Sequence, residues 1–82
     1  MYVVPNPAGT VASVGYALPK RTLVSMSVTD ITGRAMYQQP AGWMNGGEHK
    51  TALDVTAWPS GMYFITLEAG EYREVLKLSV VH

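Results

Sequence analysis

The sequence contains no cysteine, which excludes a disulfide framework and thiolate chemistry. It has no apolar run long enough for a membrane-spanning helix, and its first seven residues lack the basic and apolar regions of a signal peptide. Six basic and six acidic residues cancel to a formal net charge of zero. Charge therefore gives no reason to expect nucleic acid or an anionic membrane as a partner, and offers no protection against self-association.

The chain also lacks any pattern typical of a catalytic or metal site. His49 and His82 are the only histidines, and neither has a second ligand at helical or zinc-finger spacing. Ser60 and Asp54 complete a nominal triad with His49, but no nucleophile elbow surrounds the serine. We therefore expect no catalytic residue, no metal and no cofactor, and a protein that is not an enzyme.

What the chain does contain is one small, apolar, strand-forming domain. Its 82 residues are 48% hydrophobic, which is enough for a single thin core. No segment has the period of a helix, and about seven short segments alternate between apolar and polar residues, with turn residues roughly every 8–12 positions. This pattern predicts an all-β antiparallel sandwich or small barrel. The expected core residues are Tyr16, Val24, Met26, Val28, Leu53, Tyr63, Ile65, Leu67, Leu76 and Leu78.

The segment Leu23–Gln39 predicts a central hairpin. Its first half alternates apolar and polar residues, as a half-buried strand does. Asp30–Gly33 has the residues of a type I turn closed by glycine in the left-handed region, which produces a bulged hairpin. Arg34–Gln39 is then the returning strand, and a second, two-residue turn is expected at Gly70-Glu71.

Prolines and glycines mark the other irregular positions. Pro5 and Pro7 restrict Asn6 to an extended conformation and predict a stiff connection to an edge strand. Gly15, inside an alternating segment, predicts a bulge or a close backbone approach. Pro40–Gly47 holds three glycines and a proline, so we expect a loop rather than a strand.

Aromatic residues leave a second interpretation open. Trp43 lies in the expected Pro40–Gly47 loop, where it would fold back as a lid on the core. The alternative is that Trp43, Trp58, Tyr37 and Tyr63 stack on sugar rings. The protein would then be a carbohydrate-binding or adhesive β-sandwich module.

Four segments, in this order and at these separations, resemble one known family. They are Pro5-Asn6-Pro7, Asp30–Arg34 (DITGR), Pro59–Phe64 (PSGMYF) and a closing strand with Lys77. Together they are similar, over nearly the whole chain, to the type A C-terminal sorting domain of type IX (Por) secretion cargo. The resemblance implies an immunoglobulin-like antiparallel β-sandwich over residues 1–82, at the C-terminal end of a longer exported protein of the Bacteroidetes group.

The resemblance also implies a function and partners. The domain would direct a cargo in the same chain from the periplasm through the outer-membrane translocon to the cell surface or medium. A sortase-like cysteine peptidase would usually remove it, and the cargo would be attached to anionic lipopolysaccharide or released. The residues carried over by motif as recognition residues are Pro5, Asn6, Pro7, Asp30, Gly33, Arg34, Gly61, Tyr63, Phe64 and Lys77.

The sequence departs from the family pattern at two positions. Lys77 is the only basic residue in Val75–Val81, where the family often has adjacent basic residues, and Trp58 stands where leucine is common. A terminal strand with exposed edge groups is suited to capture by strand addition. The same edge also allows weak self-association.

Overall fold

The computed structural model describes all 82 residues and consists of strands without a helix. The strands are β1 (Tyr2–Val4), β2 (Val11–Leu18), β3 (Thr22–Asp30), β4 (Ala35–Met44), β5 (Gly47–Asp54), β6 (Gly61–Ala69) and β7 (Tyr72–Val80). The expected all-β fold is confirmed. Since the chain forms no helix, it has none that could span a membrane.

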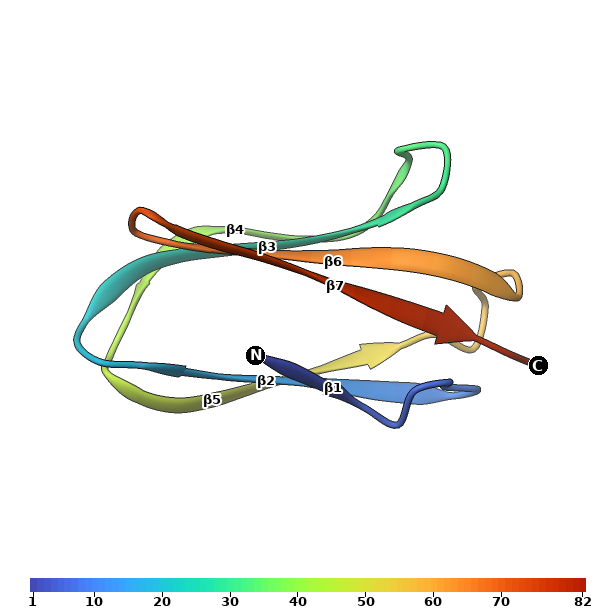
Figure 1. Cartoon of the computed structure of the whole chain (residues 1–82), viewed down its shortest axis with the longest axis horizontal. Helices are drawn as coiled ribbons and strands as arrows, with labels where there is room; N and C mark the ends of the chain where they lie inside the picture. Colours follow the sequence, from blue (N-terminus) through green and yellow to red (C-terminus); the bar gives the residue numbers. More distant parts are fainter.

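The strands form two antiparallel sheets that face each other (Figure 1). The smaller sheet has the order β1-β2-β5, and the larger has the order β4-β3-β6-β7. The chain crosses between the sheets after β2, after β4 and again after β5, so neighbouring strands are often distant in sequence. β6 lies between β3 and β7, as expected for a strand with apolar residues on both faces.

The core lies between the two sheets and is entirely apolar. Sixteen hydrophobic residues are buried there, and no buried residue is polar or charged. All the expected core residues belong to this cluster except Leu76, which is partly buried and packs against it. Period-two alternation therefore assigned the inward faces of β2, β3, β5, β6 and β7 correctly, because successive strand side chains point to opposite faces.

The central hairpin is confirmed. Gly33 has a φ of +89°, and its N–H donates to the carbonyl of Asp30 at 3.0 Å. The pairing of β3 with β4 shifts by one residue between Val28 and Thr29, which is the expected bulge. At the other end of the sheet, Ala69 pairs with Tyr72, so Gly70-Glu71 is the expected two-residue turn.

Gly15 is a point of close approach, as its sequence context predicts. The aromatic ring of Tyr2, from the neighbouring β1, lies directly over it. A Cβ on residue 15 would come within 2.5 Å of ring atoms of Tyr2. The glycine therefore lets β1 cover the outer face of β2 with an aromatic side chain.

The prediction of a loop at Pro40–Gly47 is wrong. β4 continues to Met44, and its pairing with β3 places Trp43 opposite Leu23 and extends to Met44 opposite Thr22. β4 is an edge strand, where a proline without an N–H is tolerated. A second register shift lies opposite Ser25 of β3, and it accommodates Pro40 in β4. The glycine and proline content therefore marks a bulged edge strand.

Trp43 is consequently not a lid on the core. Its side chain is 63% exposed and lies on the outer face of the larger sheet. The guanidinium of Arg21 sits over the indole ring, 5.4 Å from its centroid. This cation–π contact covers one face of the exposed ring.

Candidate recognition site

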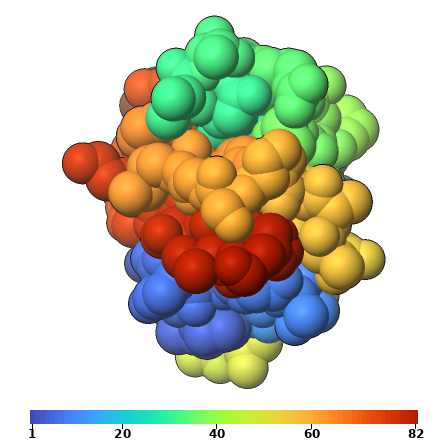
Figure 2. All heavy atoms as spheres, turned by 90° about the vertical axis from the view of Figure 1, so that its right-hand side faces the viewer, coloured from blue at the N-terminus to red at the C-terminus, as the bar shows by residue number.

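The four motif segments meet at one end of the sandwich, which we call the motif end. Across the larger sheet, Asp30 pairs with Tyr63, and Phe64 pairs with Lys77. Asn6 then contacts the strand that carries Lys77. Figure 2 shows this end of the molecule, with the C-terminal residues lying between the N-terminal segment and the beginning of β6.

Asn6 joins the beginning of the chain to its last strand. Its side-chain Nδ2 donates to the carbonyl of Lys77, and its Oδ1 accepts from the N–H of Ser79, both at 3.0 Å. Two residues later, the N–H of Ala8 donates to the carbonyl of Ser79, and the N–H of Val81 donates to the carbonyl of Ala8. Residues 6–8 thus act as a short parallel strand that covers the end of β7.

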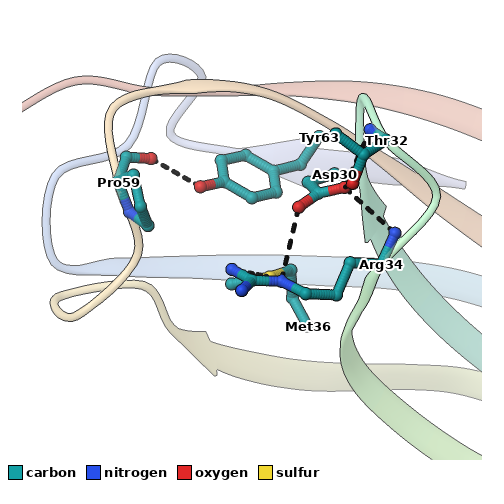
Figure 3. Close-up of polar contacts among 6 residues, drawn as sticks. All are labelled: Asp30, Thr32, Arg34, Met36, Pro59 and Tyr63. Atoms are coloured by element: carbon teal, nitrogen blue, oxygen red, sulfur yellow. Dashed lines mark hydrogen bonds and ion pairs between the residues drawn. The ribbon is translucent and has the colours of Figure 1, made fainter.

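The Asp30 carboxylate organises the turn at the motif end (Figure 3). Its Oδ1 accepts from the N–H of Thr32 at 2.8 Å, the hydroxyl of Thr32 at 2.6 Å and the N–H of Arg34 at 3.0 Å. The Thr32 hydroxyl is the main reason that the pKa of Asp30 is lowered. The ionised carboxylate therefore stabilises the turn at neutral pH. This contribution is lost as the pH falls through the lowered pKa.

Arg34 is held near Asp30 but remains accessible. Its Nε lies 3.5 Å from Oδ2 of Asp30, and its Nη2 lies 3.6 Å from the sulfur of Met36. The Arg34 side chain is still 66% exposed. A guanidinium held in this way keeps unused donors pointing to solvent, where a partner can reach them.

Among the motif residues of β6, Tyr63 and Phe64 are less exposed than Arg34. Tyr63 is buried, and its hydroxyl donates to the carbonyl of Pro59 at 2.5 Å (Figure 3). Its ring packs against Trp58 with centroids 5.1 Å apart. Tyr63 therefore fixes the loop between β5 and β6. Phe64 points to the opposite face, where it is half-buried beside the exposed Lys77.

A model of the secretion system C-terminal sorting domain family matches residues 2–81. The chain belongs to this family of type IX sorting domains. The resemblance carried by the four segments is thereby confirmed. Comparison with curated proteins found no match, and comparison with solved structures found none either.

The motif residues of the sorting domain differ in exposure, and Asp30 and Phe64 are partly buried. Tyr63 is internal, and its contacts hold the loop before β6. The exposed motif residues, which a partner can touch, are Pro5, Asn6, Pro7, Gly33, Arg34, Gly61 and Lys77. Lys77 has no carboxylate within 4 Å, so its ammonium is available to a partner.

Several residues of the motif end were not singled out by sequence. Ala8 and Ser79 supply the backbone groups that pair the two ends of the sorting domain. His82 donates its N–H to Oγ of Ser60, and its Nε2 lies 2.7 Å from the carbonyl of Trp58. These contacts join residues that are distant in the sequence, and no local pattern marks them.

The aromatic residues do not form one platform for sugar rings. Trp58 packs on Tyr63 at the motif end, whereas Trp43 pairs with Leu23 at the other end of β3. Leu23 and Asp30 lie seven residues apart on β3, which corresponds to roughly 23 Å along an extended strand. The carbohydrate-binding interpretation therefore has no support from the arrangement of these rings.

Exchanging Asn6 for aspartate should destabilise the sorting domain by about 1–2 kcal/mol. The carboxylate of Asn6→Asp still accepts from Ser79, but it cannot donate to the carbonyl of Lys77 and faces that oxygen with a charge. Urea unfolding measures the change. Asn45→Asp is the matched control, because the Asn45 side chain is exposed and makes no hydrogen bond. Equal midpoints for the two variants would show that Asn6 does not hold β7.

Gly33→Ala should lower the free energy of unfolding by about 1 kcal/mol or more. A Cβ at residue 33 meets no atom within 4 Å, so the cost comes from the left-handed φ of +89° alone. Gly42→Ala is the control, because its Cβ also meets nothing and its φ is not in the left-handed region. Chemical unfolding of both variants should separate them. A Gly33→Ala protein as stable as Gly42→Ala would rule out this turn geometry.

Proposed function

We propose that residues 1–82 are the C-terminal domain of a longer exported protein. This domain passes its cargo through the outer-membrane translocon of the type IX system. Family membership makes the chain a type IX sorting signal, which implies interaction with that system and export to the cell surface or medium. The further steps are part of the proposal. The cargo reaches the translocon from the periplasm, a sortase-like peptidase removes the domain, and the domain catalyses nothing itself.

The observation that supports this function most directly is the meeting of the four motif segments at one end. Segments from residue 5 to residue 77 become neighbours only when the sandwich is folded. A partner that binds there would distinguish a folded domain from an unfolded chain. Recognition of the motif end would thus export only folded sorting domains.

Within this site we assign direct contact with the translocon or peptidase to Arg34, Lys77 and the turn at Pro5-Asn6-Pro7. Arg34 and Lys77 provide two cations with free donors. The rigid turn at Pro5-Asn6-Pro7 presents a fixed shape beside Lys77, whereas Arg34 lies across the sheet, in the turn between β3 and β4. Asp30 and Gly33 fix the turn that carries Arg34. Gly61, Tyr63 and Phe64 build the strand on which this surface rests.

Lys77→Ala tests the assignment without disturbing the fold. The side chain is exposed and has no ion pair, so stability should change by less than about 0.5 kcal/mol. Losing a hydrogen bond from a charged group costs roughly 1.5–3 kcal/mol of binding, so export of a fused reporter should fall about tenfold or more.

Lys50→Ala provides the control for this experiment. Lys50 is also exposed and unpaired, but it lies on β5 in the other sheet. Its loss should leave both the unfolding midpoint and the exported fraction of the reporter unchanged. Normal export by a folded Lys77→Ala protein would remove Lys77 from the recognition surface.

A further inference from the structure

The last strand of the fold has a free hydrogen-bonding edge. β7 pairs with β6 on one side, and no strand lies on its other side in the sheet. The N–H and carbonyl of Ser79 point to this outer side, where Asn6 and Ala8 bind them. Because backbone groups alternate in direction along an antiparallel strand, those of Arg73 and Val75 also point outward, together with the N–H of Lys77.

These outward groups have no backbone partner within the chain. The segment at residues 6–8 reaches the edge of β7 only at its end, from the carbonyl of Lys77 onward. The edge from Arg73 to the N–H of Lys77 is therefore open. Exposed edges of this kind pair readily with another extended chain.

The side chains along the open edge specify the chemistry of its partner. Arg73, Val75 and Lys77 share the outer face of the larger sheet, and all three are exposed. Val75 is 45% exposed, and neither cation has a carboxylate within 4 Å. Every second residue along this edge therefore carries an exposed side chain, and the three side chains are in turn positive, apolar and positive.

A second copy of β7 does not fit this edge in the register centred on Val75. Antiparallel pairing of two copies of β7 centred on Val75 would place Arg73 directly opposite Lys77. Like charges in directly opposed cross-strand positions are destabilising. An acidic residue two positions on each side of an apolar residue would instead meet an opposite charge at both ends.

We propose that the Arg73–Lys77 edge of β7 is a strand-addition site for an extended segment of a partner protein with the pattern acidic–x–apolar–x–acidic. This inference rests on the proposed function and describes how the partner holds the sorting domain. The added strand pairs with the open N–H and carbonyl groups, and its carboxylates face Arg73 and Lys77. Asn6 fixes where it ends, because this side chain already occupies the next carbonyl.

The direct test uses a capped peptide of sequence TETVTET as the probe and TKTVTKT as its charge-reversed control. With the intact chain, addition of TETVTET should slow hydrogen exchange at the amides of Arg73, Val75 and Lys77. TKTVTKT should bind at least about tenfold more weakly at low salt, because it places like charges opposite each other. Equal binding of the two peptides, protection at another edge, or no binding at millimolar peptide would overturn the proposal.

Two variants that retain Lys77 separate this proposal from the proposed function. Arg73→Glu should weaken binding of TETVTET about threefold to tenfold and strengthen binding of TKTVTKT. Val75→Pro removes an outward N–H at a position where an edge strand tolerates proline, and should abolish strand addition and export. Should Val75→Pro fail to fold, Arg73→Glu decides alone.

Export of the intact fusion distinguishes the two possible failures. If the intact fusion is exported and the folded Arg73→Glu and Val75→Pro variants are exported equally well, strand addition is wrong while the sorting function stands. If the intact fusion itself is not exported, the proposed function fails. Peptide binding at the β7 edge would still be measured independently of that result.

Discussion

Leu78→Ala should lower the melting temperature by at least about 10 °C and leave a substantial part of the protein unfolded at 37 °C. Leu78 is fully buried between the sheets, where β7 pairs with the middle strand β6. Leucine-to-alanine substitutions at such positions cost about 2–5 kcal/mol, because they remove apolar contacts and leave a cavity. A domain of this length has a total stability of only roughly 4–12 kcal/mol, so the loss is a large fraction.

The control for this experiment is Leu23→Ala. It removes the same atoms from β3, but Leu23 lies on the outer face of the sheet and is 42% exposed. Thermal unfolding followed by circular dichroism should show a shift of a few degrees at most. Equal shifts for the two variants would mean that the β7 face carrying Leu78 is not a core face.

Alternation and turn chemistry made most of the fold predictable from the sequence. In β3, side chains at every second position are buried, and this pattern alone assigned Val24, Met26 and Val28 to the core. At Asp30–Gly33, the residue types fit one turn type, and Gly33 has the required positive φ. Such features depend on residues close in sequence, so a local pattern is sufficient.

The same reasoning failed at Pro40–Met44, because composition does not reveal where a strand lies in its sheet. Proline and glycine break a central strand, but an edge strand tolerates them when its free side faces solvent. The register shift opposite Ser25 accommodates the proline. The wrong prediction for Trp43 followed from this error, since a residue on the outer face of a strand cannot act as a lid on the core.

The candidate site could be predicted from the sequence only in part. The resemblance selected both Asn6 and Lys77, but no local pattern shows that these residues, 71 positions apart in the sequence, touch each other. The same limit applies to Ser79 and His82, whose partners lie at the other end of the chain or in the loop before β6. Long-range pairing is a property of the topology, and it became evident only once the sheet order was known.

In the proposed function, the motif end is the surface that the type IX system recognises. Its exposed cations and its rigid turn are brought together by buried contacts such as that of Tyr63 with Pro59. A variant that unfolds, such as Leu78→Ala, should therefore lose export together with stability. A variant that removes only an exposed contact, such as Lys77→Ala, should lose export alone.

Fusion of residues 1–82 behind a periplasmic reporter, in a cell with a type IX system, tests the central claim most directly. The measurement is the fraction of reporter at the cell surface or in the medium, compared with the reporter alone. We expect most of the fused reporter outside the cell and nearly all of the unfused reporter in the periplasm. A fused reporter that stays in the periplasm, while cargo with its own sorting domain is exported by the same cells, would contradict the account.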